Sequence, residues 1–319
     1  AMTISVMSRD ESVMTLPVAT YSREAHAAAI VHAAWREKAK RDPRWFLREV
    51  LGAHPYDKQE EIALALRDHG RIAARGCNGS GKDWVAGRLL LWGQWVHDEA
   101  ITIVIGPTHR QVVDIVWKEA RAAYLGSRIP LGGRMHFRAR WEFDDRRFAL
   151  GFATDDEYNI QGFHSPHLLV IVTEAHNVEQ THIEAAKRLN PERLLLTGNP
   201  FATAGEFYEA FYQKGDLYHT VAISAFDTPN VKQRQTVIPG MLTWEQVEER
   251  QREWGAESSM YIASVLGNFP DNLEDAVVSR SLLAAAVGRS LPPAKDDTVL
   301  LSCDVARFGA DKTVVYRRH

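Results

Sequence analysis

The chain has 319 residues, of which 45% are hydrophobic and 25% are charged, and its formal net charge is −3. These values are ordinary for a globular protein of one large or two smaller domains, and they exclude a protein that holds nucleic acid through bulk positive charge. No apolar run approaches the roughly 18 residues of a membrane-spanning helix, so the sequence predicts no membrane association.

The order of the predicted elements indicates an α/β fold. Residues 1–22 are polar and aperiodic and predict a flexible N-terminus, and residues 23–40, 44–51 and 58–68 predict three helices. Beyond them, apolar strands alternate with helices, which is typical of a mostly parallel sheet covered on both faces. The strands are predicted at residues 71–75, 101–105, 148–153, 168–172, 194–197 and 218–223, and two of the helices at 84–96 and 111–124.

The pattern becomes helical after Pro229. Residues 243–254 and 257–266 predict two helices of a small subdomain, and a Pro-rich stretch at 291–295 is typical of a linker before a new strand at 298–302. We therefore predict four segments. They are a flexible N-terminus (1–22), an α/β core (23–235), a helical lid or linker subdomain (236–290), and a linker with the first strand of another domain (291–319).

A phosphate-binding loop is indicated at residues 76–83. Its G-x-x-x-x-G-K pattern lies between a predicted strand and a predicted helix, an arrangement that directs backbone N–H groups and a helix N-terminus at phosphate oxygens. Lys82 would reach the terminal phosphates of a nucleotide, whereas Asp83 stands where Ser or Thr is usual. A glycine-rich surface turn is the alternative. The residues predicted to contact nucleotide here are Gly76, Cys77, Asn78, Gly79, Ser80, Gly81, Lys82, Asp83 and Trp84.

A second nucleotide element is predicted after the apolar strand 168–172. Such a strand usually ends in Asp-Glu, in which Asp supports Mg²⁺ and Glu polarises the attacking water, but here Thr173 precedes Glu174. The two departures are reciprocal, because the loop offers a carboxylate for a hydroxyl and the strand offers a hydroxyl for a carboxylate. We therefore hypothesise that Asp83 and Thr173 hold the Mg²⁺ of ATP with exchanged roles and that Glu174 is catalytic. A buried strand with an incidental Glu is the alternative.

Residues outside the two motifs complete the predicted nucleotide site. Gln59 would bond an adenine edge and Tyr56 would pack on its ring, although an exposed helical Gln is as plausible. Thr197 and Asn199 follow an apolar strand, where a sensor that links the terminal phosphate to movement is usually found. Residues 106–111 also close a strand, where a DNA-contacting loop would lie.

Together these segments resemble the large terminase subunit of tailed bacteriophages, the motor that packages DNA into the prohead. The resemblance covers nearly everything from about residue 45 onward, and it rests on the order and spacing of the motifs rather than on any one of them. The matching segments are residues 56–59, 76–83, 106–117, 161–164, 170–175, 197–200, 224–230 and 265–270.

This resemblance implies a P-loop ATPase core of the RecA-like, additional-strand type, then a helical lid and an RNase H-like nuclease domain. Asp304 lies in a segment similar to the first acidic strand of that nuclease, where it would bind a divalent metal in a two-metal site that cleaves concatemeric DNA. The partner acids would lie beyond His319, so the chain is expected not to cut DNA. Arg75 would be catalytic, in place of an Arg that many large terminases carry at the position of Asn78; a surface Arg is the alternative.

The resemblance further implies a set of partners. They are double-stranded DNA, the portal protein of the prohead, the small terminase subunit and other copies of the chain in a ring, all in the host cell cytoplasm. One arginine would stabilise transition-state charge in a neighbouring subunit and others would contact phosphate, whereas a solvated hairpin of mixed charge is the alternative. The candidates are Arg134, Arg138, Arg140, Arg146 and Arg147.

Two other functions compete with the packaging motor. A helicase-type RecA-like ATPase usually needs a second RecA-like domain, for which residues 230–290 are too helical and too few. A nucleotide-binding assembly module that does not hydrolyse would explain why both metal positions are altered, but such a module has little use for Glu174.

Overall fold

Two separately packed units make up the chain, residues 1–270 and 271–319. The computed structural model describes residues 3–7, 13–17, 23–154, 162–271, 280–287, 289, 300–305 and 313–318. Among these residues, no helix is both long enough and apolar enough to cross a bilayer. The predicted motif at 161–164 lies partly, and the segment 306–312 entirely, outside them.

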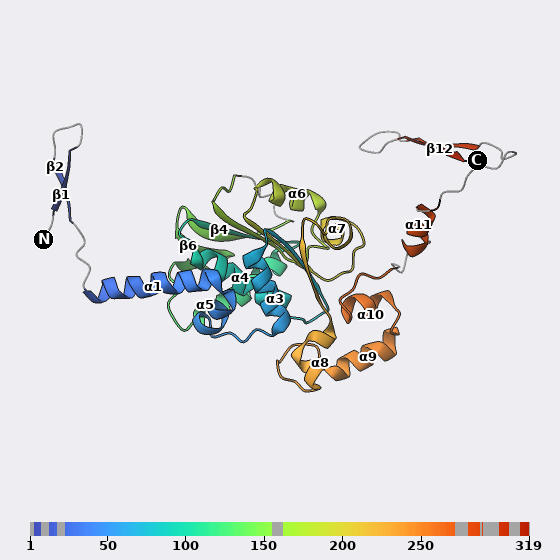
Figure 1. Cartoon of the computed structure of the whole chain (residues 1–319), viewed down its shortest axis with the longest axis horizontal. Helices are drawn as coiled ribbons and strands as arrows, with labels where there is room; N and C mark the ends of the chain where they lie inside the picture. The colour runs from blue at the N-terminus through green and yellow to red at the C-terminus, as the bar shows by residue number, and fades with distance from the viewer. Residues whose placement is uncertain are drawn as a thin grey trace. The chain divides into compact units, whose positions relative to one another are not determined.

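An eight-stranded sheet forms the centre of the first unit (Figure 1). Its order is β10-β3-β9-β8-β4-β7-β6-β5, and every neighbouring pair from β10 to β7 is parallel, whereas β6 and β5 add an antiparallel edge. This confirms the predicted α/β fold with a mostly parallel sheet. The strands are β3 (Arg71–Gly76), β4 (Ala100–Gly106), β5 (Arg134–Met135), β6 (Arg140–Asp144), β7 (Arg147–Ala153), β8 (His167–Val172), β9 (Arg193–Gly198) and β10 (His219–Ile223).

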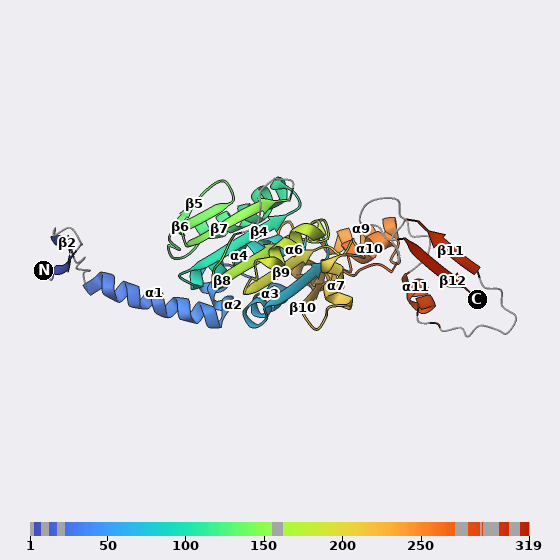
Figure 2. The ribbon, with the colours of Figure 1, turned by 90° about the horizontal axis from the view of Figure 1, so that it is seen from above.

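Helices cover both faces of this sheet, and Figure 2 shows the layers from above. The side chains of β8 alternate between the faces, since Leu168 and Val170 join one apolar cluster and Leu169 and Ile171 the other. The first face is covered by α6 (Gln180–Arg188) and α7 (Glu206–Tyr212). The second is covered by α1 (Arg23–Arg41), the short α2 (Pro43–Trp45) with a π-helical turn Phe46–Val50, α3 (Asp57–Asp68), α4 (Lys82–Val96) and α5 (Trp117–Leu125).

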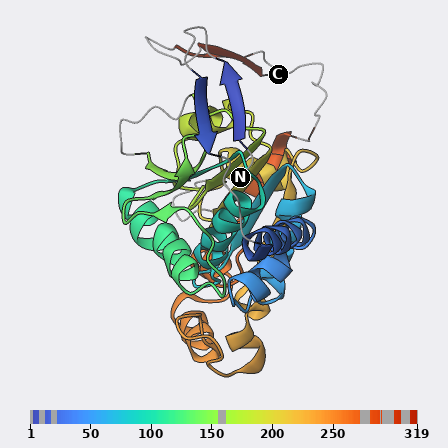
Figure 3. The ribbon, with the colours of Figure 1, turned by 90° about the vertical axis from the view of Figure 1, so that its left-hand side faces the viewer.

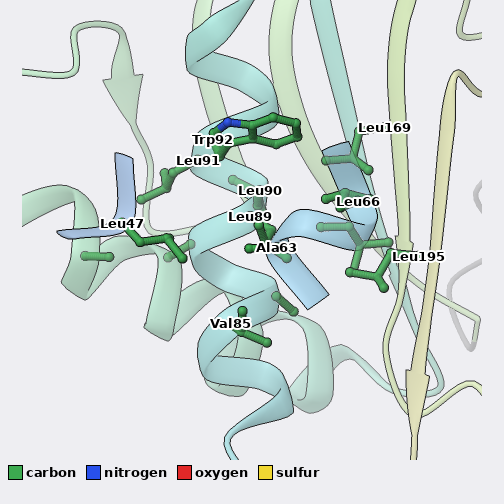
Figure 4. Packing of buried hydrophobic residues seen from close by; sticks show 14 of the residues in the cluster. Leu47, Ala63, Leu66, Val85, Leu89, Leu90, Leu91, Trp92, Leu169 and Leu195 are labelled. Carbon is green, nitrogen blue, oxygen red and sulfur yellow. The ribbon is translucent and has the colours of Figure 1, made fainter. Parts of the chain in front are cut away.

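Helix α4 is buried on nearly all sides, because it lies between the sheet and the other helices of its face (Figure 4). Leu89, Leu90 and Trp92 pack in the same cluster as Leu66 of α3 and Leu195 of β9. An apolar helix without a polar stripe is expected only in such a setting. The predicted helix 111–124 is present, but its first part, Gln111–Val116, is π-helical and α5 follows it.

A smaller helical lobe follows the sheet, and Figure 3 shows it beside the layers. It comprises a 3₁₀ turn Ala225–Asp227, α8 (Pro229–Gln233), α9 (Trp244–Trp254) and α10 (Ser259–Ser264). The apolar cluster of the lobe includes Cys77 of the phosphate loop together with Val231, Val247 and Val265, so the lobe packs against that loop.

At both ends of the chain the structure has elements that the sequence did not predict. Residues 3–7 and 13–17, expected to lack regular structure, form the antiparallel strands β1 (Thr3–Met7) and β2 (Val13–Pro17). At the other end, α11 (Arg280–Val287), which fell in the predicted lid, belongs to the second unit. That unit also contains β11 (Leu300–Asp304), which was predicted, and its antiparallel partner β12 (Val314–Arg318), which was not.

Gly267→Ala is expected to destabilise the first unit more than Gly255→Ala. Both glycines have a positive φ, +64° and +80°, so an alanine is strained at either position by about 1–3 kcal/mol. Only at Gly267 would the new Cβ overlap the Ile223 carbonyl oxygen and approach the Cys77 nitrogen, which adds about 1–3 kcal/mol of overpacking. Urea unfolding of the two variants measures the difference, and equal free energies would contradict the close packing.

Candidate nucleotide-binding site

The phosphate loop joins β3 to α4 and is held in place from three sides. The backbone N–H of Cys77 donates to Ile223 O and that of Asn78 to Ser264 O, each at 2.9 Å. The amide of Asn199 donates to Gly76 O at 2.7 Å and to Asn78 Oδ1 at 2.9 Å. The loop is therefore anchored to β10, to the helical lobe and to the segment after β9, where a sensor was predicted.

Tyr56 and Gln59 anchor the same loop from the start of α3. The Tyr56 hydroxyl donates to Ser80 O at 2.7 Å, and the Gln59 amide donates to Gly81 O at 3.2 Å. Gln59 is only 3% exposed, and its side-chain oxygen accepts from the backbone N–H of Tyr56. The contacts that both side chains make are thus with the loop itself. Both residues also line the cavity described below, and their contact with an adenine stays a prediction.

Lys82 and Asp83 begin α4 and face the cavity. Lys82 is 6% exposed, and its ammonium donates to Cys77 O at 3.1 Å and to Gly76 O at 3.5 Å. The hydroxyl of Thr173, after β8, donates to Asp83 Oδ1 at 2.8 Å. The two residues of the hypothesised exchange, 90 positions apart in the chain, are thus hydrogen-bonded partners.

The pKa of Asp83 is raised, mainly by burial and also by the negative charge of Glu174, against the lowering effect of the Thr173 hydrogen bond. Within the part of the chain that the structure describes, no cation pairs directly with this carboxylate. A divalent ion bound here would supply the missing positive charge, so the residues present fit the predicted metal.

Glu174 lines the cavity from the end of β8 in an unusual backbone conformation. Its φ is +47°, and such a conformation in a residue other than glycine costs on the order of 1 kcal/mol, often at functional sites. The Glu174 carbonyl accepts from Asn177 N, while Thr173 N and Ala175 N donate to Ile105 O and Thr197 O. Flanking hydrogen bonds to β4 and β9 hold the turn that directs this carboxylate into the cavity.

His176 lies beside Glu174, with Nδ1 3.4 Å from Glu174 Oε2, and its side chain is 7% exposed. Burial, and then the charge of Lys82, lowers its pKa from 6.5 to about 4. The histidine is therefore neutral at neutral pH, and motif reading did not find it because a lone His carries no pattern.

This histidine makes stability depend on pH. Between pH 6.5 and about 4 the unfolded chain binds a proton at His176 that the folded chain does not, so stability falls as the pH falls through that window. The slope is at most about 1.4 kcal/mol per pH unit. His176→Asn should flatten the dependence in urea unfolding at several pH values, whereas His109→Asn, at an exposed position, should not. Equal slopes in both variants would contradict the burial of a neutral imidazole.

A cavity of about 980 Å³ joins these groups. That volume lies at the upper end of the range of ligand pockets. Sequence reading missed the helical lobe's contribution, because a loop without a motif gives no signal. The lining residues are His54, Tyr56, Gln59, 78–84, Ile115, Glu119, Glu174, Asn199, Pro229, Gln233 and 237–241.

Several predicted site residues lie elsewhere. Arg75 does not line the cavity; its guanidinium lies 5.1 Å from the ring of Phe211 and 5.5 Å from that of Phe269, and burial lowers its pKa. Side chains alternate along β3, and Arg75 points to the same face as Ala73, which α7 covers. The Arg75 side chain therefore lies beside Phe211 and Phe269 and not in the cavity. Thr197 is buried, with its hydroxyl 3.5 Å from Val172 O, and does not line the cavity.

Gly76 and Cys77 do not line the cavity, and burial raises the Cys77 pKa to about 11. Both cysteines are free. Asp304 ends β11 in the second unit and is exposed there.

Of the five predicted arginines, Arg147 has a structural role, since its guanidinium donates hydrogen bonds to the carbonyls of Gln94 and Trp95. Arg140 pairs with Glu142. Arg134, Arg138 and Arg146 are exposed on the antiparallel edge of the sheet.

Comparisons with known proteins agree with this geometry. No protein-family model matches the chain. The chain is 22% identical over 311 residues to the probable terminase large subunit of Enterobacteria phage P7, covering 86% of this chain and 60% of that protein. It therefore spans about three fifths of the length of that curated relative.

Two solved structures share the fold. The large terminase ATPase domain of Thermus phage P74-26 matches with 17% identity and a TM-score of 0.53, over 70% of this chain and 96% of that domain. The large terminase of a thermophilic bacteriophage, in complex with ADP, matches with 14% identity and a TM-score of 0.52, over 83% of this chain and 65% of that one. The chain is thus a homologue of a phage large terminase and has the fold of large terminase ATPase domains.

Proposed function

We propose that the chain is the ATPase motor domain of a phage large terminase, which hydrolyses ATP to move double-stranded DNA into a prohead. One observation carries the proposal: Lys82, Asp83 and Glu174 line a single cavity at the carboxyl ends of β3 and β8, and Thr173 donates a hydrogen bond to Asp83 from behind that wall. The complexes of the thermophilic bacteriophage's large terminase with ADP and with ATP-gamma-S support a nucleotide as the ligand.

Each group has a distinct task in this proposal. The loop N–H groups and the Lys82 ammonium would bind phosphate oxygens, with Lys82 exchanging its present bonds to Gly76 O and Cys77 O for them. Asp83 and Thr173 would hold Mg²⁺, which when bound neutralises phosphate charge. Glu174 would orient the attacking water and accept its proton.

Lys82→Ala tests the nucleotide site. Loss of the ammonium should weaken the binding of a fluorescent ATP analogue and abolish hydrolysis, because no other cation lines the loop side of the cavity among the described residues. Lys58→Ala, which removes an ion pair with Glu61 on α3, is the matched control. An unchanged affinity of Lys82→Ala for the ATP analogue would contradict the proposal.

Partners and assembly follow from the proposed motor. Double-stranded DNA, the portal of the prohead, the small terminase subunit and neighbouring copies in a ring would be its partners in the host cytoplasm. Arg134, Arg138 and Arg146 are the candidates for the group that acts in a neighbouring subunit, since all three are exposed. Arg146 also pairs with Glu99, but its side chain is 82% exposed. Arg140 is held by Glu142, and Arg147 by backbone carbonyls.

A nucleotide-binding assembly module is the second candidate, favoured by the altered residues at both metal positions. The two readings differ in turnover. ATP binding without hydrolysis, even with DNA present and copies assembled, would support the module.

Cleavage of DNA is a further part of the proposal for the full-length protein, in which Asp304 would bind a divalent metal.

A further inference from the structure

We propose that His97, His167 and Glu192 bind one Zn²⁺ ion, at a site separate from the nucleotide cavity. Each residue offers one potential ligand atom, and the three atoms lie within 4.8 Å of one another. Two imidazoles and a carboxylate form a donor set that suits Zn²⁺ and neighbouring transition metals rather than Mg²⁺ or Ca²⁺.

The three residues come from the ends of rigid elements at the opposite edge of the sheet from the phosphate loop. His97 caps the C-terminus of α4, whose N-terminus carries Lys82 and Asp83. His167 is the first residue of β8, whose other end leads to Thr173, and Glu192 directly precedes β9. Ligands on such elements are already close together before an ion binds, which lowers the cost of ordering them.

Existing contacts hold two of the ligands in place. His167 Nδ1 lies 2.9 Å from Glu192 Oε2, while the other oxygen of Glu192 pairs with Arg193. The His97 ring stacks on His167 with centroids 3.6 Å apart and has, among the described residues, no hydrogen bond. A ring nitrogen of His97 is therefore available to an ion.

The space between the ligands matches a single small occupant. A cavity of about 10 Å³ lies among His97, His167, Glu192 and their neighbours Trp92 and Gly93. About one water-sized body fits such a volume. Zn²⁺ bonds of about 2.0–2.2 Å set tetrahedral ligand atoms about 3.3–3.6 Å apart. The 2.9 Å contact between His167 Nδ1 and Glu192 Oε2 would therefore open slightly, and His97 would turn out of its stack on His167 to reach the ion.

Charges of both signs surround the site. Arg193 and Lys40 are near enough to His97 to oppose a cation there, whereas Glu192 favours one. The C-terminus of α4 adds a partial negative charge at His97. Arg193 is partly neutralised by its pair with Glu192 and donates to Leu66 O, so the opposing charge is compensated.

Isothermal titration calorimetry tests the site. Zn²⁺ is titrated, in the absence of nucleotide, into protein that carries no polyhistidine tag. One ion per chain is expected, with affinity weakened at least about tenfold in His97→Ala, His167→Ala and Glu192→Gln. His69→Ala is the matched control, because His69 and His219 form a second stacked pair, with centroids 4.2 Å apart, outside the proposed ligand set. Its affinity should be unchanged.

Two results would overturn the site. One is the absence of stoichiometric Zn²⁺ binding by the wild type, and the other is binding that persists undiminished in His97→Ala and His167→Ala. Circular dichroism checks that each variant folds, and Co²⁺ in the wild type gives a readout free of substitution, since tetrahedral histidine ligation produces strong visible absorption that octahedral aqueous Co²⁺ lacks. Failure here leaves ATP binding by wild-type protein unaffected, so it is distinguishable from failure of the proposed motor.

Discussion

Glu174→Gln is expected to lower the rate of ATP hydrolysis by about 10²–10⁴-fold while leaving nucleotide affinity nearly unchanged. The substitution keeps the size and hydrogen-bonding shape of the side chain but removes the group that accepts a proton from water. The residue is held at the cavity by a turn with φ of +47°, a conformation that glutamine adopts no less readily than glutamate. The change should therefore affect the chemical step rather than the fold.

The measurement is hydrolysis with Mg²⁺ and double-stranded DNA, at chain concentrations high enough for copies to assemble, alongside equilibrium binding of an ATP analogue. Glu179→Gln is the matched control, because that carboxylate belongs to a nearby residue after β8 and its side chain is 76% exposed. If Glu174→Gln hydrolyses ATP as fast as the control variant, Glu174 is not the base.

Asp83→Thr and Thr173→Asp should each abolish Mg²⁺-dependent turnover, and the double variant should recover much of it. Each single change leaves two hydroxyls or two carboxylates where the site holds one of each, facing one another at 2.8 Å. Two buried carboxylates repel, and the pKa of Asp83 is already raised, first by burial and then by the charge of Glu174. The double variant restores one hydroxyl and one carboxylate in the usual order.

The comparison requires the wild type, both single variants and the double variant, since the coupling is the difference between the double variant and the sum of the singles. A coupling of at least about 1.4 kcal/mol, or tenfold in rate, is expected. Thr181→Asp, at an exposed position outside the cavity, controls for added negative charge. A double variant with no more turnover than the single variants would contradict the exchange of roles.

The strands, and the positions of the two predicted nucleotide motifs at their ends, could be read from the sequence because their signals are local. Apolar runs such as 168–172 identify buried strands, and the spacing of glycines before Lys82 identifies the loop. Parallel strands then bring their carboxyl ends to one edge, so the sequence alone placed Thr173 near Asp83. The hydrogen bond between them follows from that topology.

The rest depends on long-range packing that no local pattern encodes. Arg75 adjoins the loop in sequence, yet strand alternation turns its side chain toward Phe211 and Phe269 on the far face. Residues 237–241 line the cavity only because the helical lobe folds back onto the loop. The burial of His176 likewise arises from contacts between distant segments.

A crystal structure with a non-hydrolysable ATP analogue and Mn²⁺ in place of Mg²⁺ tests the central claim most directly, because the anomalous signal of Mn²⁺ locates the ion. The account predicts phosphates along residues 79–82 and the ion coordinated by, or linked through water to, both Asp83 and Thr173, with Glu174 facing the terminal phosphate. An analogue bound outside this cavity, or an ion that contacts neither Asp83 nor Thr173, would contradict it.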